Sequence, residues 1–315
     1  MLGKLRLRLT LYISAVIGCM LLLIALAVFW NSPEGYRLWV SNPQAATTFI
    51  HRTVITSGII LLIVFLGSLF ITDRAMVPVK KAWQKQIDFT ADASHELRTP
   101  LAVIQTNLEL VMGNPEETVE SQKKWLDSIL SESKRMAKLV EGLLILSRAD
   151  SGQQMLMMSH FMLDLALKDV LCSYEAVAKA KGVVMTSGLA SSVKFYGDSD
   201  RIKQLVVILL DNAVKYTDTN GRITVQLIRK DKHVVLSVSD TGVGIAQEDL
   251  NRIFDRFYRA AHTKSGNQGG AGLGLAIAYW IVREHRGIIR VESSLGGGTT
   301  FSVMLPIELR KNRCR

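Results

Sequence analysis

The sequence predicts a multidomain membrane protein with two membrane-spanning helices, an antiparallel helical hairpin and a C-terminal α/β domain. Three observations predict this architecture. Two long apolar runs near the N-terminus carry no charge, two apolar stripes with 3–4 residue spacing follow them, and residues 159–305 mix helical and strand-like patterns. A chain of 315 residues with mean hydropathy +0.21 is too apolar to be disordered and unlike a purely soluble protein.

Residues 9–30 and 54–72 are the two uncharged runs, and each can cross the ~30 Å hydrocarbon core as a helix. The alternative for the first run is a cleaved signal peptide, but the run is too long and lacks a small-residue cleavage site. Lysines and arginines concentrate in 1–8 and 73–88 and are sparse in 31–53. This asymmetry predicts a cytoplasmic N-terminus, a short extracytoplasmic loop at 31–53, and a cytoplasmic linker helix at 73–88.

Residues 89–150 have the pattern of a helical hairpin. An apolar stripe runs through 89–111, Gly113-Asn114-Pro115 interrupts it, and a second stripe runs through 126–144. Two helices alone cannot bury two such broad stripes against each other. We therefore expect a homodimer, in which two hairpins form a four-helix bundle.

The first helix of the hairpin contains the segment Ser94-His-Glu-Leu-Arg-Thr-Pro-Leu101. His95 falls between stripe positions, so its imidazole is expected to reach solvent. Pro100 cannot donate to the carbonyl of Glu96, which predicts a bend just after the histidine. Thr99 lies four residues after His95 and so shares its helix face.

Helical and alternating patterns define the domain at 155–308, which is followed by a basic tail at 309–315. The predicted elements are helices 164–181 and 199–215, strands 223–228 and 234–238 with a turn at 229–233, and strands 288–293 and 299–305 joined across Gly296-Gly297-Gly298.

Two segments of this domain carry side chains suited to a nucleotide. Asn212 on a helix face offers a neutral oxygen to Mg²⁺, and Lys215 offers a point charge to phosphate. Asp240 follows a strand and can accept a hydrogen bond from an exocyclic amine. The adjacent Gly242 and Gly244 allow the backbone to approach a flat ring.

A third segment, with glycines at 270, 272 and 274, opens an apolar helix whose first amides can bind phosphate. Each segment alone has an ordinary explanation: a strand-to-loop turn, a flexible linker or a surface helix. A dinucleotide-binding turn is excluded for the glycine segment because no strand precedes it. The order and spacing of the three segments together favour a nucleotide-binding site.

Together these motifs resemble those of sensor histidine kinases. Residues 94–101 resemble the phosphoacceptor box of that family. The Asn, Asp-Gly and Gly-rich segments resemble the N, G1 and G2 boxes of the ATPase superfamily that these kinases share with gyrase and MutL. Residues 254–259 resemble the F box of these kinases, and residues 298–301 resemble their last glycine box. Residues 260–268 correspond to the mobile lid over ATP. The resemblance covers residues 73–305.

The resemblance implies a dimeric four-helix bundle followed by an α/β sandwich of the histidine-kinase/gyrase ATPase type. It implies ATP as substrate and Mg²⁺ held by Asn212. It makes His95 the phosphoacceptor, Glu96 the group that orients it and accepts its proton, and Thr99 the residue that positions water for dephosphorylation. The ATP-binding residues it implies are Asn212, Lys215, Tyr216, Asp240, Gly242, Gly244, Gly270, Gly272, Gly274 and Thr299.

Two departures from the family pattern stand out. Many members carry a second Asn one turn before the Mg²⁺-binding Asn, whereas this chain has Ile208, which cannot coordinate a metal. Many members also insert a relay domain of the HAMP type, for which the segment between residues 72 and 95 is too short. We therefore expect the second membrane helix to continue almost directly into the hairpin.

The function expected is that of a membrane-bound kinase with both termini in the cytoplasm. It would phosphorylate its own His95 and pass the group to an aspartate of a cognate response regulator, and act as a phosphatase toward that regulator. A membrane sensory partner such as a transporter fits the short loop. One alternative is an inactive scaffold that binds ATP or a regulator. A nucleic-acid-associated ATPase, suggested by the net charge of +10, is disfavoured by the membrane runs, so no nucleic-acid partner is expected.

Overall fold

The computed structural model describes residues 11–12, 15–20, 23–24, 43–152, 155–260 and 270–308. The chain divides into two compact units, Met1–Thr90 and Ala91–Arg315. The first predicted membrane helix, 9–30, lies largely outside the described residues, and the residues within it that are described are helical.

Helix α3 spans Pro43–Gly113 and continues without interruption through Pro78 and Pro100. Within the described part of the chain, Val54–Gly113 is the one helical stretch long and apolar enough to cross a membrane, judged by length and composition. The helix starts earlier than the predicted membrane helix, so the end of the predicted loop is helical. Proline suits the first helical turn, and no further Gly or Pro occurs before Gly58.

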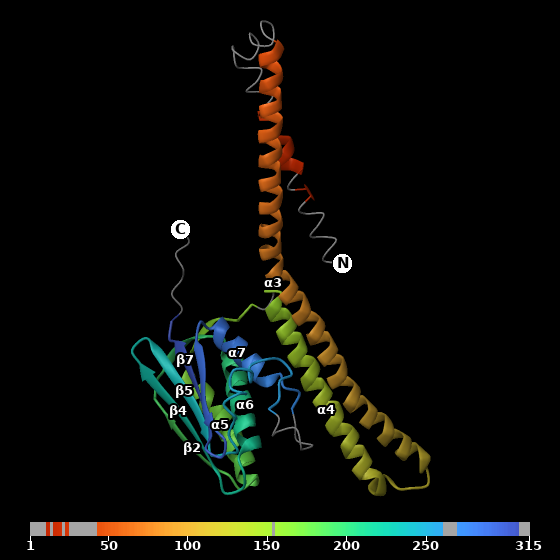
Figure 1. Cartoon of the computed structure of the whole chain (residues 1–315). Helices are drawn as coiled ribbons and strands as arrows, with labels where there is room; N and C mark the ends of the chain where they lie inside the picture. Colours follow the sequence, from red (N-terminus) through yellow and green to blue (C-terminus); the bar gives the residue numbers. More distant parts are fainter. Residues whose placement is uncertain are drawn as a thin grey trace. The chain divides into compact units, whose positions relative to one another are not determined.

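Helix α4 (Val119–Asp150) returns beside the second half of α3 to form the hairpin (Figure 1). The Thr118 side chain caps its N-terminus. The buried amide of Gln122 donates to the carbonyl of Val111 in α3 at 3.2 Å and to the carbonyl of Asn114, just after that helix, at 2.7 Å, and so closes the turn. Further along, the buried Asn107 donates to the Ser128 hydroxyl at 2.9 Å. The two helices are thus registered by side-chain hydrogen bonds.

Much of the apolar surface of the hairpin is exposed in the single chain. The exposed residues from the two predicted stripes include Leu108, Leu126, Leu130, Val140 and Leu144. Exposed aliphatic side chains in such number are the surface that a second hairpin would cover in the predicted four-helix bundle.

The rest of the second unit is an α/β domain. Its elements are β1 (Ser159–Met162), α5 (Leu163–Ala180), β2 (Val184–Leu189), β3 (Lys194–Gly197), α6 (Ser199–Tyr216), β4 (Arg222–Lys230), β5 (His233–Asp240), α7 (Gly274–Glu284), β6 (Ile288–Ser294) and β7 (Gly298–Pro306). The main sheet has the order β2-β4-β5-β7-β6, with β2 parallel to β4 and all other pairs antiparallel. Strands β1 and β3 form a separate antiparallel pair.

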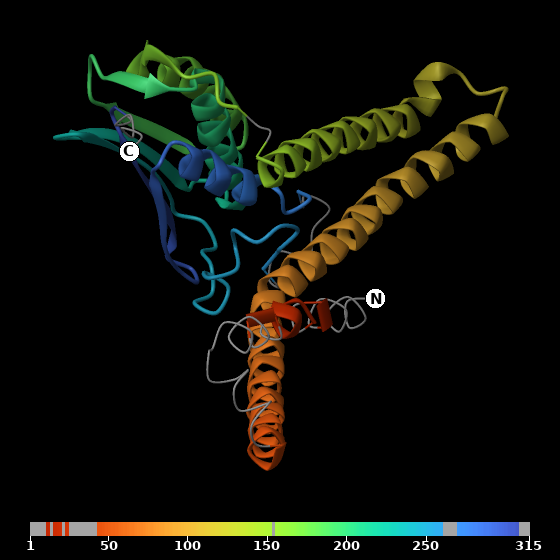
Figure 2. The same cartoon turned by 90° about the horizontal axis from the view of Figure 1, so that it is seen from above.

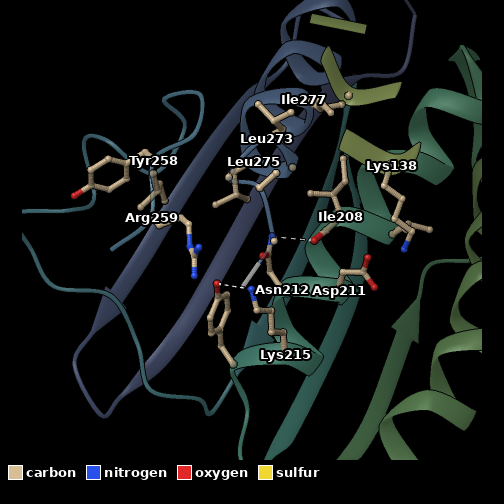
Figure 3. A pocket seen from close by; sticks show the side chains of 18 of the residues that line it. Lys138, Ile208, Asp211, Asn212, Lys215, Tyr258, Arg259, Leu273, Leu275 and Ile277 are labelled. Atoms are coloured by element: carbon tan, nitrogen blue, oxygen red, sulfur yellow. Dashed lines mark hydrogen bonds between the residues drawn. The ribbon is translucent and has the colours of Figure 1, made fainter. Parts of the chain in front are cut away.

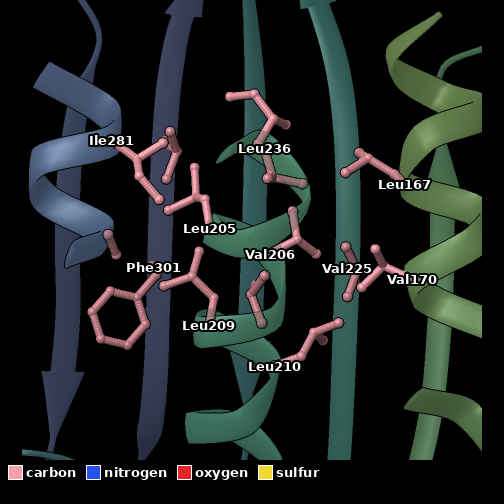
Figure 4. Packing of buried hydrophobic residues seen from close by; sticks show 14 of the residues in the cluster. Leu167, Val170, Leu205, Val206, Leu209, Leu210, Val225, Leu236, Ile281 and Phe301 are labelled. Carbon is pink, nitrogen blue, oxygen red and sulfur yellow. The ribbon is translucent and has the colours of Figure 1, made fainter. Parts of the chain in front are cut away.

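Helices α5, α6 and α7 cover one face of the main sheet, as Figure 1 and Figure 2 show from two directions. Burial alternates along β4, β5 and β7, because successive side chains of a strand point to opposite faces. Leu205 and Leu209 of α6 are fully buried between Phe301 of β7 and Leu236 of β5 (Figure 4). This core fixes the helix that carries Asn212 against the strand that carries Asp240.

Candidate functional site

A cavity of about 850 Å³ opens beside α6, α7 and the ends of β5 and β7. That volume suits a ligand of nucleotide size. Nine of the predicted ATP-binding residues line it, namely Asn212, Lys215, Tyr216, Asp240, Gly244, Gly270, Gly272, Gly274 and Thr299. The tenth, Gly242, is not in the lining and instead supports the wall through its backbone N–H.

Asp240 is a buried carboxylate at the end of β5, with 9% of its surface exposed. The β5–β7 register places it opposite Thr299. Its Oδ1 accepts hydrogen bonds from the N–H groups of Gly242 at 2.9 Å and of Thr299 at 3.3 Å. Burial raises the pKa of Asp240, and these two bonds partly oppose the rise. Since both bonds fall on Oδ1, Oδ2 is available to accept from an amine of a ligand in the cavity.

Asn212 lies one helical turn after Ile208 on the cavity side of α6 (Figure 3). Its Nδ2 donates to the Ile208 carbonyl at 3.0 Å. This bond commits the amide nitrogen to the backbone and leaves Oδ1 as the group that Asn212 offers to the cavity. A neutral oxygen held in this way fits Mg²⁺, which prefers oxygen ligands. Within the described residues, no cluster of three His, Cys, Asp or Glu side chains forms a metal site of its own.

Ile208 also lines the cavity and packs beneath the first turn of α7. A Cβ added at Gly274 would lie 3.3 Å from its Cγ2 atom. The side chain therefore takes a packing position between α6 and α7, and offers no ligand atom to a metal.

Cationic side chains converge on the same cavity. Lys215 donates from Nζ to the Tyr216 hydroxyl at 3.0 Å and lies 4.6 Å from the centre of that ring. Figure 3 shows Arg259 reaching into the cavity from the opposite side. Two cations facing one space, beside the first amides of α7, form an environment that favours phosphate.

The two ends of the loop at 258–271 are joined at the cavity edge. Phe257 has φ 59°, which is unusual for a bulky side chain, and its N–H donates to the Gly272 carbonyl at 3.0 Å. Gly272 has φ 71°, and a Cβ there would lie 2.7 Å from the Phe257 carbonyl carbon. Only glycine fits this position. The described ends of the loop are therefore held in one defined arrangement.

Two protein families match this chain. Residues 85–152 match the His Kinase A (phospho-acceptor) domain. Residues 197–309 match the Histidine kinase-, DNA gyrase B-, and HSP90-like ATPase family. The chain belongs to the sensor histidine kinases.

Individual relatives agree with this assignment. The chain is 35% identical over 234 residues to the sensor histidine kinase RppB of Synechocystis sp., covering 74% of this chain and 52% of the relative. It is 34% identical over 271 residues to the sensor protein CiaH of Streptococcus pneumoniae, covering 84% and 59%. The chain thus spans little more than half the length of these relatives. Among solved structures, the Acinetobacter baumannii histidine kinase AdeS matches with TM-score 0.57 and 26% identity, covering 68% of this chain and 98% of that one.

The three predicted catalytic residues lie apart from the cavity lining. His95 and Thr99 are exposed on α3, and Glu96 is half-buried beside them. None of the three belongs to the cavity lining. The structure therefore brings nine of the ten predicted ATP-binding residues together and leaves the predicted phosphoacceptor outside their pocket.

The cavity is also lined by residues outside the set predicted to bind ATP. They include Lys138, Gly142, Asp211, Ile245, Tyr258, Arg259 and Phe301. Asp211 accepts a hydrogen bond from the hydroxyl of Tyr174, a residue of α5. Arg259 has a sequence signal, because it is the last residue of the F-box segment. Lys138 and Gly142 have none, because they belong to α4, in the hairpin.

Proposed function

We propose that this chain is the kinase of a two-component pair, which transfers the γ-phosphoryl group of ATP to His95 and then to an aspartate of a response regulator. The observation that carries the proposal is the cavity in which the Asp240 carboxylate, the Asn212 amide oxygen and two cations face one nucleotide-sized space. The same folded unit carries an exposed histidine within a phosphoacceptor segment.

Each end of ATP has suitable partners in this cavity. The adenine amine would donate to Oδ2 of Asp240, whose other oxygen is already occupied by two backbone N–H groups. The phosphates would contact Lys215, Arg259 and the first amides of α7. Burial of Asp240 strengthens its discrimination, because a base without an amine there would leave the carboxylate unpaired.

Asn212 would hold Mg²⁺ through Oδ1. The ion would neutralise charge on the phosphates, and it would keep several of its waters because the described residues supply few oxygen ligands. Ile208 adds no ligand. Nucleotide phosphates, Asn212 and water would therefore make up the coordination.

In the transfer step, a ring nitrogen of His95 would attack the γ-phosphorus. The bond from that phosphorus to the β,γ-bridging oxygen breaks, ADP leaves with the electron pair, and Glu96 takes the imidazole proton. Neutral imidazole is a competent nucleophile near pH 7. Since His95 does not line the cavity, the step requires the nucleotide-binding domain to move to a histidine of its own chain or of a partner chain.

The finer assignments are part of the same proposal. The exposed stripes of the hairpin support a homodimer built as a four-helix bundle. The apolar part of α3 supports a membrane-bound protein, with two spans and both termini in the cytoplasm as the topology. Thr99, exposed on the face of His95, would serve dephosphorylation of the regulator. The short extracytoplasmic segment fits a signal received through a membrane partner such as a transporter.

Incubation with γ-labelled ATP and Mg²⁺ tests the proposal. We expect His95→Gln to abolish incorporation while a fluorescent ATP analogue still binds. The matched control is His233→Gln, an exposed histidine at the start of β5, which should incorporate as the wild type does. Incorporation that persists in His95→Gln would refute the assignment. Binding without incorporation in the wild type would favour a nucleotide-binding scaffold.

A further inference from the structure

An ion pair joins the end of the hairpin to the chain just before the loop at 258–271. The described ends of that loop are called its base. Arg256 donates from two guanidinium nitrogens to the two carboxylate oxygens of Asp150, at 2.7 and 2.6 Å. The side chains are 30% and 50% exposed, and 106 residues separate them in the sequence. A bidentate pair of this kind fixes orientation as well as distance.

Asp150 lies at the end of a helix, and Arg256 lies next to the residue that joins the two ends of the loop. Asp150 is the last residue of α4, where a negative charge opposes the helix dipole. Its place there is therefore not explained by the stability of its own helix. Arg256 directly precedes Phe257, the strained residue whose N–H holds Gly272. The ion pair thus lies one residue away from the point where the two ends of the loop are joined.

The same helix also contacts the far end of the loop. Leu273, which follows Gly272, packs against Gly142 of α4. A Cβ added at Gly142 would lie 3.3 Å from Cδ1 of Leu273 and 3.4 Å from Cδ1 of Ile277. Leu139, Ile145 and Leu146 of α4 are buried nearby. The last three turns of α4 therefore touch the chain just before the loop and just after it.

We infer that Arg256 is a positioning residue for ATP binding, which acts through Asp150 to keep the two described ends of the loop joined at Phe257 and Gly272. With the pair formed, Phe257 and Gly272 stay joined and Arg259 is presented to the cavity. With the pair broken, the strained Phe257 can relax and the loop loses its fixed base. The hairpin thereby influences nucleotide affinity. The inference rests on the proposed function, since it assumes that the cavity binds ATP.

The test is a charge-exchange cycle in the full-length chain, with the dissociation constant of a fluorescent ATP analogue as the readout. Arg256→Asp and Asp150→Arg should each weaken binding about fivefold, the size expected for a half-exposed bidentate pair. The double exchange should recover most of the loss. Arg256→Lys should bind the analogue almost as weakly as Arg256→Asp, because a single ammonium cannot replace the two guanidinium hydrogen bonds. Lys203→Ala, which removes the exposed pair with Asp169 between α5 and α6, is the matched control and should bind as the wild type does.

A second readout separates positioning from general stability. The losses in the single exchanges should shrink at high salt, which screens a half-exposed pair, whereas the unfolding midpoint should change little. Single variants that bind like the wild type, or a double exchange no better than the singles, would overturn the inference. Because binding is measured without phosphoryl transfer, failure of His95 phosphorylation in the wild type would count against the proposed function alone.

Discussion

At the residue scale, the most informative side chain is Asp240. Its Oδ1 accepts from two backbone N–H groups, and within the described part of the chain no donor is recorded for the other oxygen. We expect Asp240→Asn to weaken ATP binding by roughly 1–3 kcal/mol, the usual cost of losing a buried acceptor. GTP binding should fall much less, because guanine presents a carbonyl at that position. Titration of both nucleotides measures the difference, and an equal loss for both would show that Asp240 serves folding.

His285 gives the domain a dependence on pH. It is 1% exposed, its Nδ1 lies 2.8 Å from the Ile281 carbonyl, and its Nε2 accepts from the Asp198 N–H at 3.0 Å. Nε2 must accept, so Nδ1 carries the proton and the ring is neutral. Burial lowers the pKa of His285 below its usual value of 6.5.

The sign of the effect follows from that shift. The unfolded chain takes up the proton more readily, so stability is fully present above about pH 6.5 and decreases as the pH falls toward the lowered pKa. We expect the thermal midpoint to fall between pH 7 and pH 5, and His285→Gln to flatten this slope. The exposed His233→Gln should leave the slope unchanged. An unaltered slope in His285→Gln would contradict the buried neutral assignment.

Nine of the residues that line the cavity are predictable from the sequence, but their contacts are not. Asp240 and Thr299 were both predicted as ATP-binding residues, yet their hydrogen bond depends on the register of β5 against β7. The role of Ile208 was predicted only as the loss of a ligand, and its packing against Gly274 required the structure. The pair of Asp150 and Arg256 spans two domains and has no local signal.

At the element scale, helices α5 and α6 and strands β4, β5, β6 and β7 occur within a few residues of their predicted bounds. They are long or strongly patterned, so local periodicity predicts them well. Strands β1, β2 and β3 were not predicted. The first and third are four residues long, and β2 is largely exposed, with no clear alternation. Such strands are stabilised by their neighbours in the sheet and not by local pattern.

The Asp198 side chain links the start of α6 to the segment just before β1. Its carboxylate caps the helix by accepting from the Arg201 N–H at 3.1 Å, and its other oxygen accepts from the Met157 N–H at 2.9 Å. We expect Asp198→Ala to destabilise the protein by about 2 kcal/mol or more, since a cap and a second hydrogen bond are lost together. Thr118→Ala removes only the exposed cap of α4 and should cost about 1 kcal/mol or less. Thermal unfolding followed by circular dichroism compares them, and equal shifts would refute the linking role of Asp198.

At the scale of the whole molecule, the unpaired stripes of the hairpin predict a dimer. Leu130 is 53% exposed on α4, and Leu165 is 54% exposed on α5. We expect Leu130→Asp to weaken dimerisation strongly, because burying one leucine contributes about 1.5–3 kcal/mol and each dimer has two. Leu165→Asp adds the same charge at equal exposure outside the bundle and should leave the dimer intact. Light scattering in detergent reports both, and a dimer unaffected by Leu130→Asp would place the interface elsewhere.

The proposed function requires that this molecule phosphorylates His95 with ATP bound in the cavity of its C-terminal domain. The most direct measurement maps the phosphate by mass spectrometry at alkaline pH, on the peptide that contains Ser94, His95 and Thr99, after incubation with ATP and Mg²⁺. We expect one acid-labile phosphate on His95, and none when Asn212→Ala removes the cavity oxygen. An acid-stable phosphate on Ser94 or Thr99, or a His95 phosphate that persists in Asn212→Ala, would contradict it.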